Sequence, residues 1–77
     1  MEEYYRHFKG NVYRVLHRAK HSETLEEMVV YQAMYGERDI WVRPKTMFEE
    51  VIERDGKTFI RFSPISAEEA EKIINNL

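Results

Sequence analysis

The chain has 77 residues, of which 43% are hydrophobic and 34% are charged, and its formal net charge is −2. This length predicts a single domain with a small core, and the composition is typical of a folded protein and not of a disordered one. The sequence has no cysteine, which excludes disulfides, thiolate nucleophiles and thiolate-bound zinc.

The N-terminal segment, MEEYYRHF, carries two acids where a signal peptide carries positive charge. No apolar run approaches the about 20 residues that a membrane helix requires, so we expect a cytoplasmic protein with no membrane partner. Basic residues and histidines, without any acid, occupy the stretch between Tyr4 and Ser22, whereas acids dominate from Glu49 onward. This distribution predicts either ordinary solvated faces or a dipolar surface with one basic face.

Short runs of β-branched and aromatic residues alternate with turn signals about every 8 to 12 residues, a pattern typical of small β barrels and sandwiches. We predict a first strand at residues 5–8, ended by the turn Lys9-Gly10-Asn11. A second strand at residues 12–18 has mixed faces, which indicates a bend or partial cover. In the polar connection that follows, Thr24-Leu25-Glu26-Glu27 matches a capping box and favours a single helical turn.

The strongest strand pattern covers residues 28–35, where apolar side chains on both faces indicate a central, covered strand. A short strand at residues 40–43 is expected to pair with it as a hairpin and to end at Pro44, which removes a ladder donor. Residues 46–53 suit either a helical face or a strand. Because Asp55-Gly56 is a hairpin signal, we predict a turn and then a strand from Phe48, paired with residues 57–62.

The C-terminal segment has the pattern of an amphipathic helix over residues 66–77. Ser66-Ala67-Glu68-Glu69 matches a capping box, and the apolar stripe that follows consists of Ala67, Ala70, Ile73, Ile74 and Leu77. A helix of about three turns is marginal alone, so we expect it to pack on the rest of the domain or on a partner chain. A homodimer through this helix or through a sheet face is one such arrangement.

Several strings of the chain occur together in one known family. They are RHFKG, HSET, VVY, WVRP and MF, followed by DGKTFIRF. In this combination the chain resembles the bacterial family catalogued as Domain of Unknown Function 1653, over residues 5–65. The resemblance implies an SH3-like barrel and no established activity. We therefore predict a mainly β fold: one domain, residues 1–77, with an SH3-like barrel of about five strands over residues 4–65 and a short C-terminal helix over residues 66–77.

A catalytic or metal site is not supported by the histidines of this chain. His21-Ser22-Glu23 has the residue types of a hydrolytic triad, but such triads are assembled from distant parts of a fold, and a polar loop explains three consecutive residues better. His17 and His21 would share a face only on a helix, and their segment is predicted as strand and loop. We predict no enzyme activity and no cofactor, with a hydrolase-like or metal site around His21 as the alternative.

An aromatic and basic face is the better candidate. Trp41 and Arg43 share one face of a short strand, and Tyr31 lies on the strand expected beside it. Small SH3-like barrels commonly bind ligands on aromatic surfaces, where a guanidinium recognises phosphate or carboxylate. The alternative is that Trp41 fills the core and that Arg43 has an acidic partner in Glu23 or Glu50.

The basic N-terminal stretch also interleaves aromatic rings with cations, as platforms for single-stranded nucleic acid do. We therefore predict a binding module for nucleic acid or a peptide, with a salt-dependent interaction. Its alternative is a structural or assembly domain that docks on a larger protein or self-associates. The predicted ligand-binding residues are Arg6, His7, His21, Ser22, Glu23, Tyr31, Trp41 and Arg43.

Overall fold

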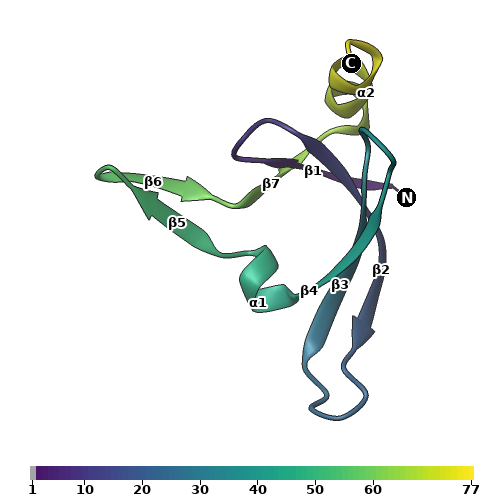
Figure 1. Cartoon of the computed structure of the whole chain (residues 1–77), viewed down its shortest axis with the longest axis vertical. Helices are drawn as coiled ribbons and strands as arrows, with labels where there is room; N and C mark the ends of the chain where they lie inside the picture. Colours follow the sequence, from purple (N-terminus) through teal and green to yellow (C-terminus); the bar gives the residue numbers. More distant parts are fainter. Residues whose placement is uncertain (1) are drawn as a thin grey trace.

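A computed structural model describes residues 2–77 and confirms a mainly β fold with a short C-terminal helix (Figure 1). Seven strands form two sheets in which every pairing is antiparallel. The five-stranded sheet has the order β4-β3-β2-β1-β7 and consists of β1 (Glu3–His7), β2 (Val12–Lys20), β3 (Glu27–Ala33), β4 (Ile40–Pro44) and β7 (Phe62–Ile65). The second sheet is a hairpin of β5 (Val51–Arg54) and β6 (Lys57–Ile60).

The five-stranded sheet is not closed, because β4 and β7 form its two edges. The chain bends between the sheets at Arg61, whose N–H donates to the Glu50 carbonyl at 2.9 Å and whose carbonyl accepts from the Phe8 N–H at 3.0 Å. The strand β7 that follows was not predicted. It pairs with β1 at the edge of the sheet, where Pro64 is tolerated although it lacks a donor.

A bend or partial cover was predicted for the second strand, and the β2–β3 register shifts between Val15 and His17. The predicted helical turn at residues 24–27 is wrong. The His21 ring accepts hydrogen bonds from the backbone N–H groups of Glu23 and Thr24, so the segment is a polar turn held by local bonds. Leu25 then takes a left-handed φ of 63°, which no helix continues.

The segment after Pro44 also differs from the prediction. Residues 45–48 form one helical turn, α1 (Lys45–Phe48), and the next strand begins at Val51 and not at Phe48. The turn carries Phe48 into the core, where its ring stacks on Phe62 with centres 4.3 Å apart. The predicted hairpin is confirmed, since Asp55 and Gly56 both have positive φ, as a type I′ turn requires.

Each face of the five-stranded sheet carries an apolar cluster. The cluster on the inner face consists of Val15, Val29, Tyr31, Phe48 and Phe62. On the outer face α2 (Ala67–Asn75) packs on β1 and β2, and its Ala70 is fully buried against Tyr4, Val12 and Met34. Ser66 caps this helix by accepting the Glu69 N–H at 3.0 Å, as predicted. No helix within residues 2–77 has the length and hydropathy needed to cross a membrane.

Candidate functional site

One end of the inner face opens into a small pocket of about 220 Å³. We term it the aromatic pocket, and its lining consists of His7, Tyr13, Tyr31, Tyr35, Trp41, Arg43 and Phe62. The β3–β4 register sets Tyr31 opposite Trp41 and Val29 opposite Arg43. Because alternate residues of a strand share a face, this register turns Trp41 and Arg43 toward the inner face together.

The floor of the aromatic pocket is a rigid set of rings. Tyr31 and Phe62 are buried, and the Tyr13 ring lies edge-on to them with centres 5.6 and 5.3 Å away. The hydroxyl groups of Tyr13 and Tyr35 share a hydrogen bond of 2.6 Å. Burial, and then this hydrogen bond, raise the pKa of Tyr13 well above its usual range, so its hydroxyl stays neutral at physiological pH.

Trp41 and Arg43 form the rim of the pocket. Trp41 is 52% exposed, so it does not fill the core. The Arg43 guanidinium lies 5.8 Å from the centre of the Phe62 ring, within cation–π range. The acids considered for Arg43 do not pair with it, because Glu50 pairs with Arg61 at 2.9 Å and Glu23 lies in the β2–β3 loop. The ion pairs of residues 2–77 do not include Arg43.

His7 stands at the side of the pocket nearest the β1–β2 turn. Its Nδ1 accepts the Lys9 backbone N–H at 3.2 Å, so Nε2 carries the proton of the neutral ring. Burial lowers the pKa of His7 below 6.5, and the positive charges of Arg61, Lys9 and Arg43 lower it further. The potential at this site is therefore positive, although the chain as a whole has a net charge of −2.

The structure brings together four of the eight predicted site residues: His7, Tyr31, Trp41 and Arg43. Because side chains alternate along β1, Arg6 lies on the outer face of the sheet, where its Nε donates to the Gly10 carbonyl. The other three, at positions 21–23, lie in the β2–β3 loop and line no part of the aromatic pocket. Within residues 2–77 no group of three or more acidic, histidine or cysteine side chains is arranged to hold a metal.

Three lining residues were not predicted: Tyr13, Tyr35 and Phe62. Tyr35 could have been found in the sequence, since it lies on the same face of its predicted strand as Tyr31, whereas the predicted strand of Tyr13 carries no other pocket residue. Phe62 joins the pocket only because β7 pairs with β1, which sets it opposite His7. No short-range signal in the sequence predicts the pairing of β7 with β1.

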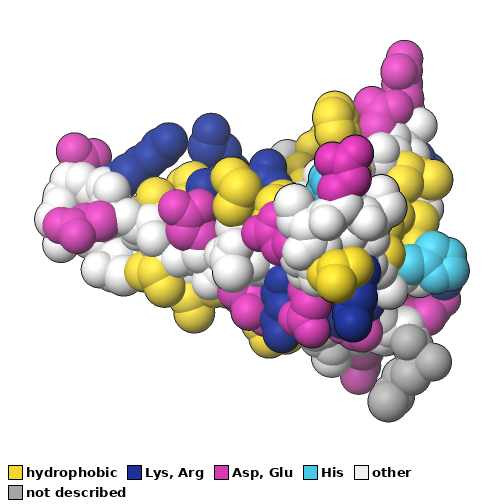
Figure 2. All heavy atoms as spheres, turned by 90° about the horizontal axis from the view of Figure 1, so that it is seen from below, with side chains coloured by type: hydrophobic (Ala, Val, Ile, Leu, Met, Phe, Trp, Pro, Cys, Tyr) yellow, Lys and Arg dark blue, Asp and Glu magenta, His cyan; other side chains and the backbone are white. Residues whose placement is uncertain are grey.

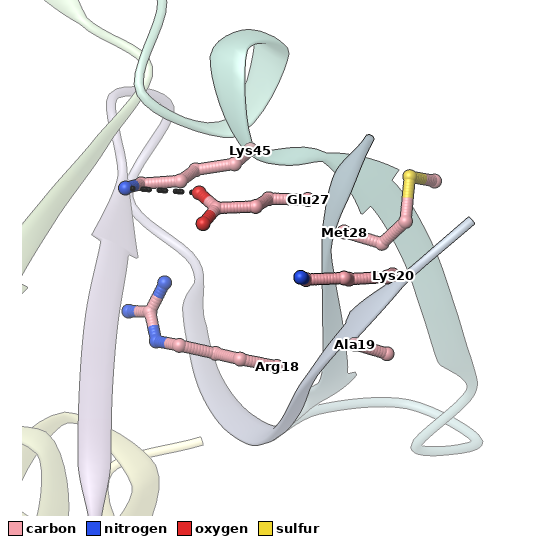
Figure 3. A pocket seen from close by; sticks show the side chains of 6 residues that line it. All are labelled: Arg18, Ala19, Lys20, Glu27, Met28 and Lys45. Carbon is pink, nitrogen blue, oxygen red and sulfur yellow. Dashed lines mark ion pairs between the residues drawn. The ribbon is translucent and has the colours of Figure 1, made fainter. Parts of the chain in front are cut away.

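A second pocket, of about 440 Å³, lies at the opposite end of the inner face, and we term it the charged pocket (Figure 3). Its cations are Arg18, Lys20 and Lys45, and Figure 3 shows the Glu27 carboxylate among them. Glu27 pairs with Lys45 at 3.4 Å, and Arg18 pairs with Glu3 at 2.9 Å. Because two of its three cations already have acidic partners, the charged pocket is the weaker candidate for an anion site.

The chain matches, over residues 3–64, the family model described as a protein of unknown function, DUF1653. It belongs to the DUF1653 family. The crystal structure of a DUF1653 protein from Bordetella bronchiseptica is similar in sequence and fold: the identity is 28%, the match covers 84% of this chain and 86% of that one, and the TM-score is 0.73. No curated protein matches the chain. The predicted family is thus confirmed, and every residue of the aromatic pocket lies within the DUF1653 match.

Proposed function

We propose that this DUF1653 domain is a binding module and that the aromatic pocket takes a ligand with a planar ring and a negative charge. The observation that carries the proposal is the Arg43 guanidinium, which has no acidic partner among residues 2–77 and lines the same pocket as the exposed ring of Trp41. A guanidinium held against an aromatic surface favours bidentate recognition of phosphate or carboxylate. The exposed indole supplies a stacking face for the ring of the same ligand.

The size of the aromatic pocket limits what enters it. Sites for drug-sized molecules occupy about 300–1,000 Å³, whereas this pocket has about 220 Å³. One ring system, such as a nucleobase or an aromatic side chain, fits this space. The rest of a larger ligand would lie on the surface outside.

Binding, and not catalysis, is the role that the lining supports. The neighbours of the His7 ring are the rings of Phe8, Tyr13 and Phe62, and its Nδ1 is occupied by a backbone N–H. A general base needs a nucleophile or an orienting acid within hydrogen-bond reach. The aromatic pocket offers His7 neither of them, so we propose that this face holds its ligand without reacting with it.

The proposal is tested by the fluorescence of Trp41, the one tryptophan of the chain, during titration with adenosine monophosphate and with a short peptide of tyrosine and aspartate. We expect at least one probe to quench the emission. Arg43→Gln should weaken binding by about tenfold or more, because it removes a charge-assisted contact. Lys72→Gln is the matched control, since it removes the same charge from α2. Absence of quenching by both probes would contradict the proposal.

A second candidate function, self-association, is favoured by one observation on β4. This strand is an edge of the sheet, and its outward side chains Ile40 and Val42 are 60% and 61% exposed. An unpaired edge with apolar side chains is a template for pairing with another strand. If the domain assembles this way, light scattering will show a dimer that Val42→Lys converts to a monomer. A monomer at all concentrations would contradict it.

A further inference from the structure

We propose that the site extends from the aromatic pocket to the β5–β6 hairpin, and that its ligand is a single strand of nucleic acid whose successive bases lie along a line of rings. We term this line the aromatic track; it consists of the partly exposed rings of Phe59, Phe8 and His7, and it ends at Phe62, the buried floor of the aromatic pocket. The inference rests on the proposed function, because the aromatic pocket is one end of the track.

The rings of the aromatic track are continuous. The Phe59 and Phe8 rings stack with centres 5.7 Å apart, Phe8 lies 4.5 Å from His7, and His7 lies 5.0 Å from Phe62. His7 also lines both the aromatic pocket and an open groove of about 710 Å³ between the β1–β2 turn and β6. His7 is therefore the residue that the aromatic pocket and the groove share, and the groove is lined by Phe8 and Phe59 as well as by Arg6 and Glu69 on the side of α2.

Cations lie beside two rings of this line, Phe8 and Phe62. Arg54 and Lys9 lie 5.5 and 5.9 Å from the centre of the Phe8 ring, as Arg43 does from Phe62 at 5.8 Å. None of these three cations is among the ion pairs of residues 2–77. Rings for bases and cations for the backbone, repeated along a surface, are the two elements of single-strand recognition.

The hairpin separates its charges by face. The register sets Ile52 opposite Phe59 and Arg54 opposite Lys57, so alternation places both cations on the face that carries Phe59 and leaves Glu53 on the other. In Figure 2 the β5–β6 hairpin projects to the left, with Lys, Arg and hydrophobic side chains along its upper side, acidic side chains at its tip and further hydrophobic side chains protruding from its lower side. One acid, Glu69 of α2, lines the groove. Burial lowers the pKa of His7, and the positive charges of Arg61, Lys9 and Arg43 lower it further.

The repetition of ring and cation selects the class of ligand. A small molecule would use the aromatic pocket alone and would have no use for Phe8, Phe59 and Arg54. A single nucleic-acid strand repeats a planar ring and a negative charge at every unit, and its bases are free to stack on protein rings. In a duplex the bases are already stacked and paired, so the track offers them little.

The experiment is a titration of Trp41 fluorescence with thymidine monophosphate and with thymidine oligomers of two, four and eight units. The same titration is also carried out with a uridine octamer and with a duplex. We expect each base added along the track to tighten binding by about fivefold or more, until the track is filled. Phe8→Leu and Arg54→Gln should abolish most of this gain while mononucleotide binding persists. Arg54→Gln should also reduce the slope of log affinity against log salt by about 0.7.

The outcomes separate this inference from the proposed function. If the mononucleotide or the tyrosine–aspartate peptide quenches Trp41 but oligomer length has no effect, the track is not a nucleic-acid site and the pocket proposal stands. Equal affinity for duplex and single strand would also overturn the inference. If Phe8→Leu fails to fold, Arg54→Gln decides, because Arg54 is exposed on the hairpin. Lys72→Gln should match the wild-type length dependence.

Discussion

His7 is the residue at which the aromatic pocket meets the open groove. In the free domain burial, and then three nearby cations, hold its pKa below 6.5, so the ring is neutral at pH 7. A phosphate bound beside it would offset that positive charge and raise the pKa of His7 in the complex. Ligand binding is then linked to proton uptake.

This linkage predicts that the affinity for an anionic ligand rises as the pH falls through the pKa of His7 in the complex and levels off below its lowered pKa in the free domain. The measurement is a series of mononucleotide titrations between about pH 5 and pH 8. His7→Asn is the matched variant, because an Asn oxygen replaces Nδ1 as acceptor of the Lys9 N–H but does not titrate. If His7→Asn shows the same pH dependence as the wild type, protonation of His7 does not contribute to ligand binding.

The candidate site was half predictable at the level of single residues. Tyr31, Trp41 and Arg43 followed from strand alternation and from one hairpin register, both of which are short-range properties. Positions 21–23 were chosen for their chemical types alone. The His21 side chain instead organises a loop, since its ring accepts two backbone N–H groups.

At the scale of elements, local signals decided the predictions that were confirmed. Asp55-Gly56 formed its hairpin and Ser66 capped its helix, because each depends on the backbone of a few neighbouring residues. The helical turn α1 was not predictable in the same way. Its conformation is selected by the burial of Phe48 against Phe62, a contact across the fold that outweighs local preference.

The role of α1 gives a stability prediction. Phe48→Ala should lower the free energy of unfolding by about 3–5 kcal/mol, because it removes a ring that is 2% exposed from the inner core. Met47→Ala changes the preceding residue of the same turn, whose side chain is half exposed, and should cost within about 0.5 kcal/mol. Urea unfolding followed by circular dichroism measures both. If Phe48→Ala and Met47→Ala lowered the free energy of unfolding equally, burial of the Phe48 ring would not be the way in which α1 stabilises the domain.

At the scale of the whole molecule, the distribution of charge matters more than its total. The net charge of −2 would not suggest an anionic ligand. The fold nevertheless leaves Arg43, Arg54 and Lys9 beside aromatic rings, while other cations pair with acids at the charged pocket and elsewhere. The sequence indicated a basic N-terminal region, but the cations contributed by β4 and the hairpin became part of the same surface only through folding.

The central claim, that the aromatic face of the sheet is the binding surface, is tested most directly by two-dimensional ¹H–¹⁵N NMR during titration with a tetramer of thymidine. The account predicts that the largest shifts occur at the indole N–H of Trp41 and at the amides of His7, Phe8 and Arg43. The amides of residues 21–23, in the β2–β3 loop, should not move. Shifts confined to α2, to the charged pocket or to the outer side of β4, or no shifts at all, would contradict it.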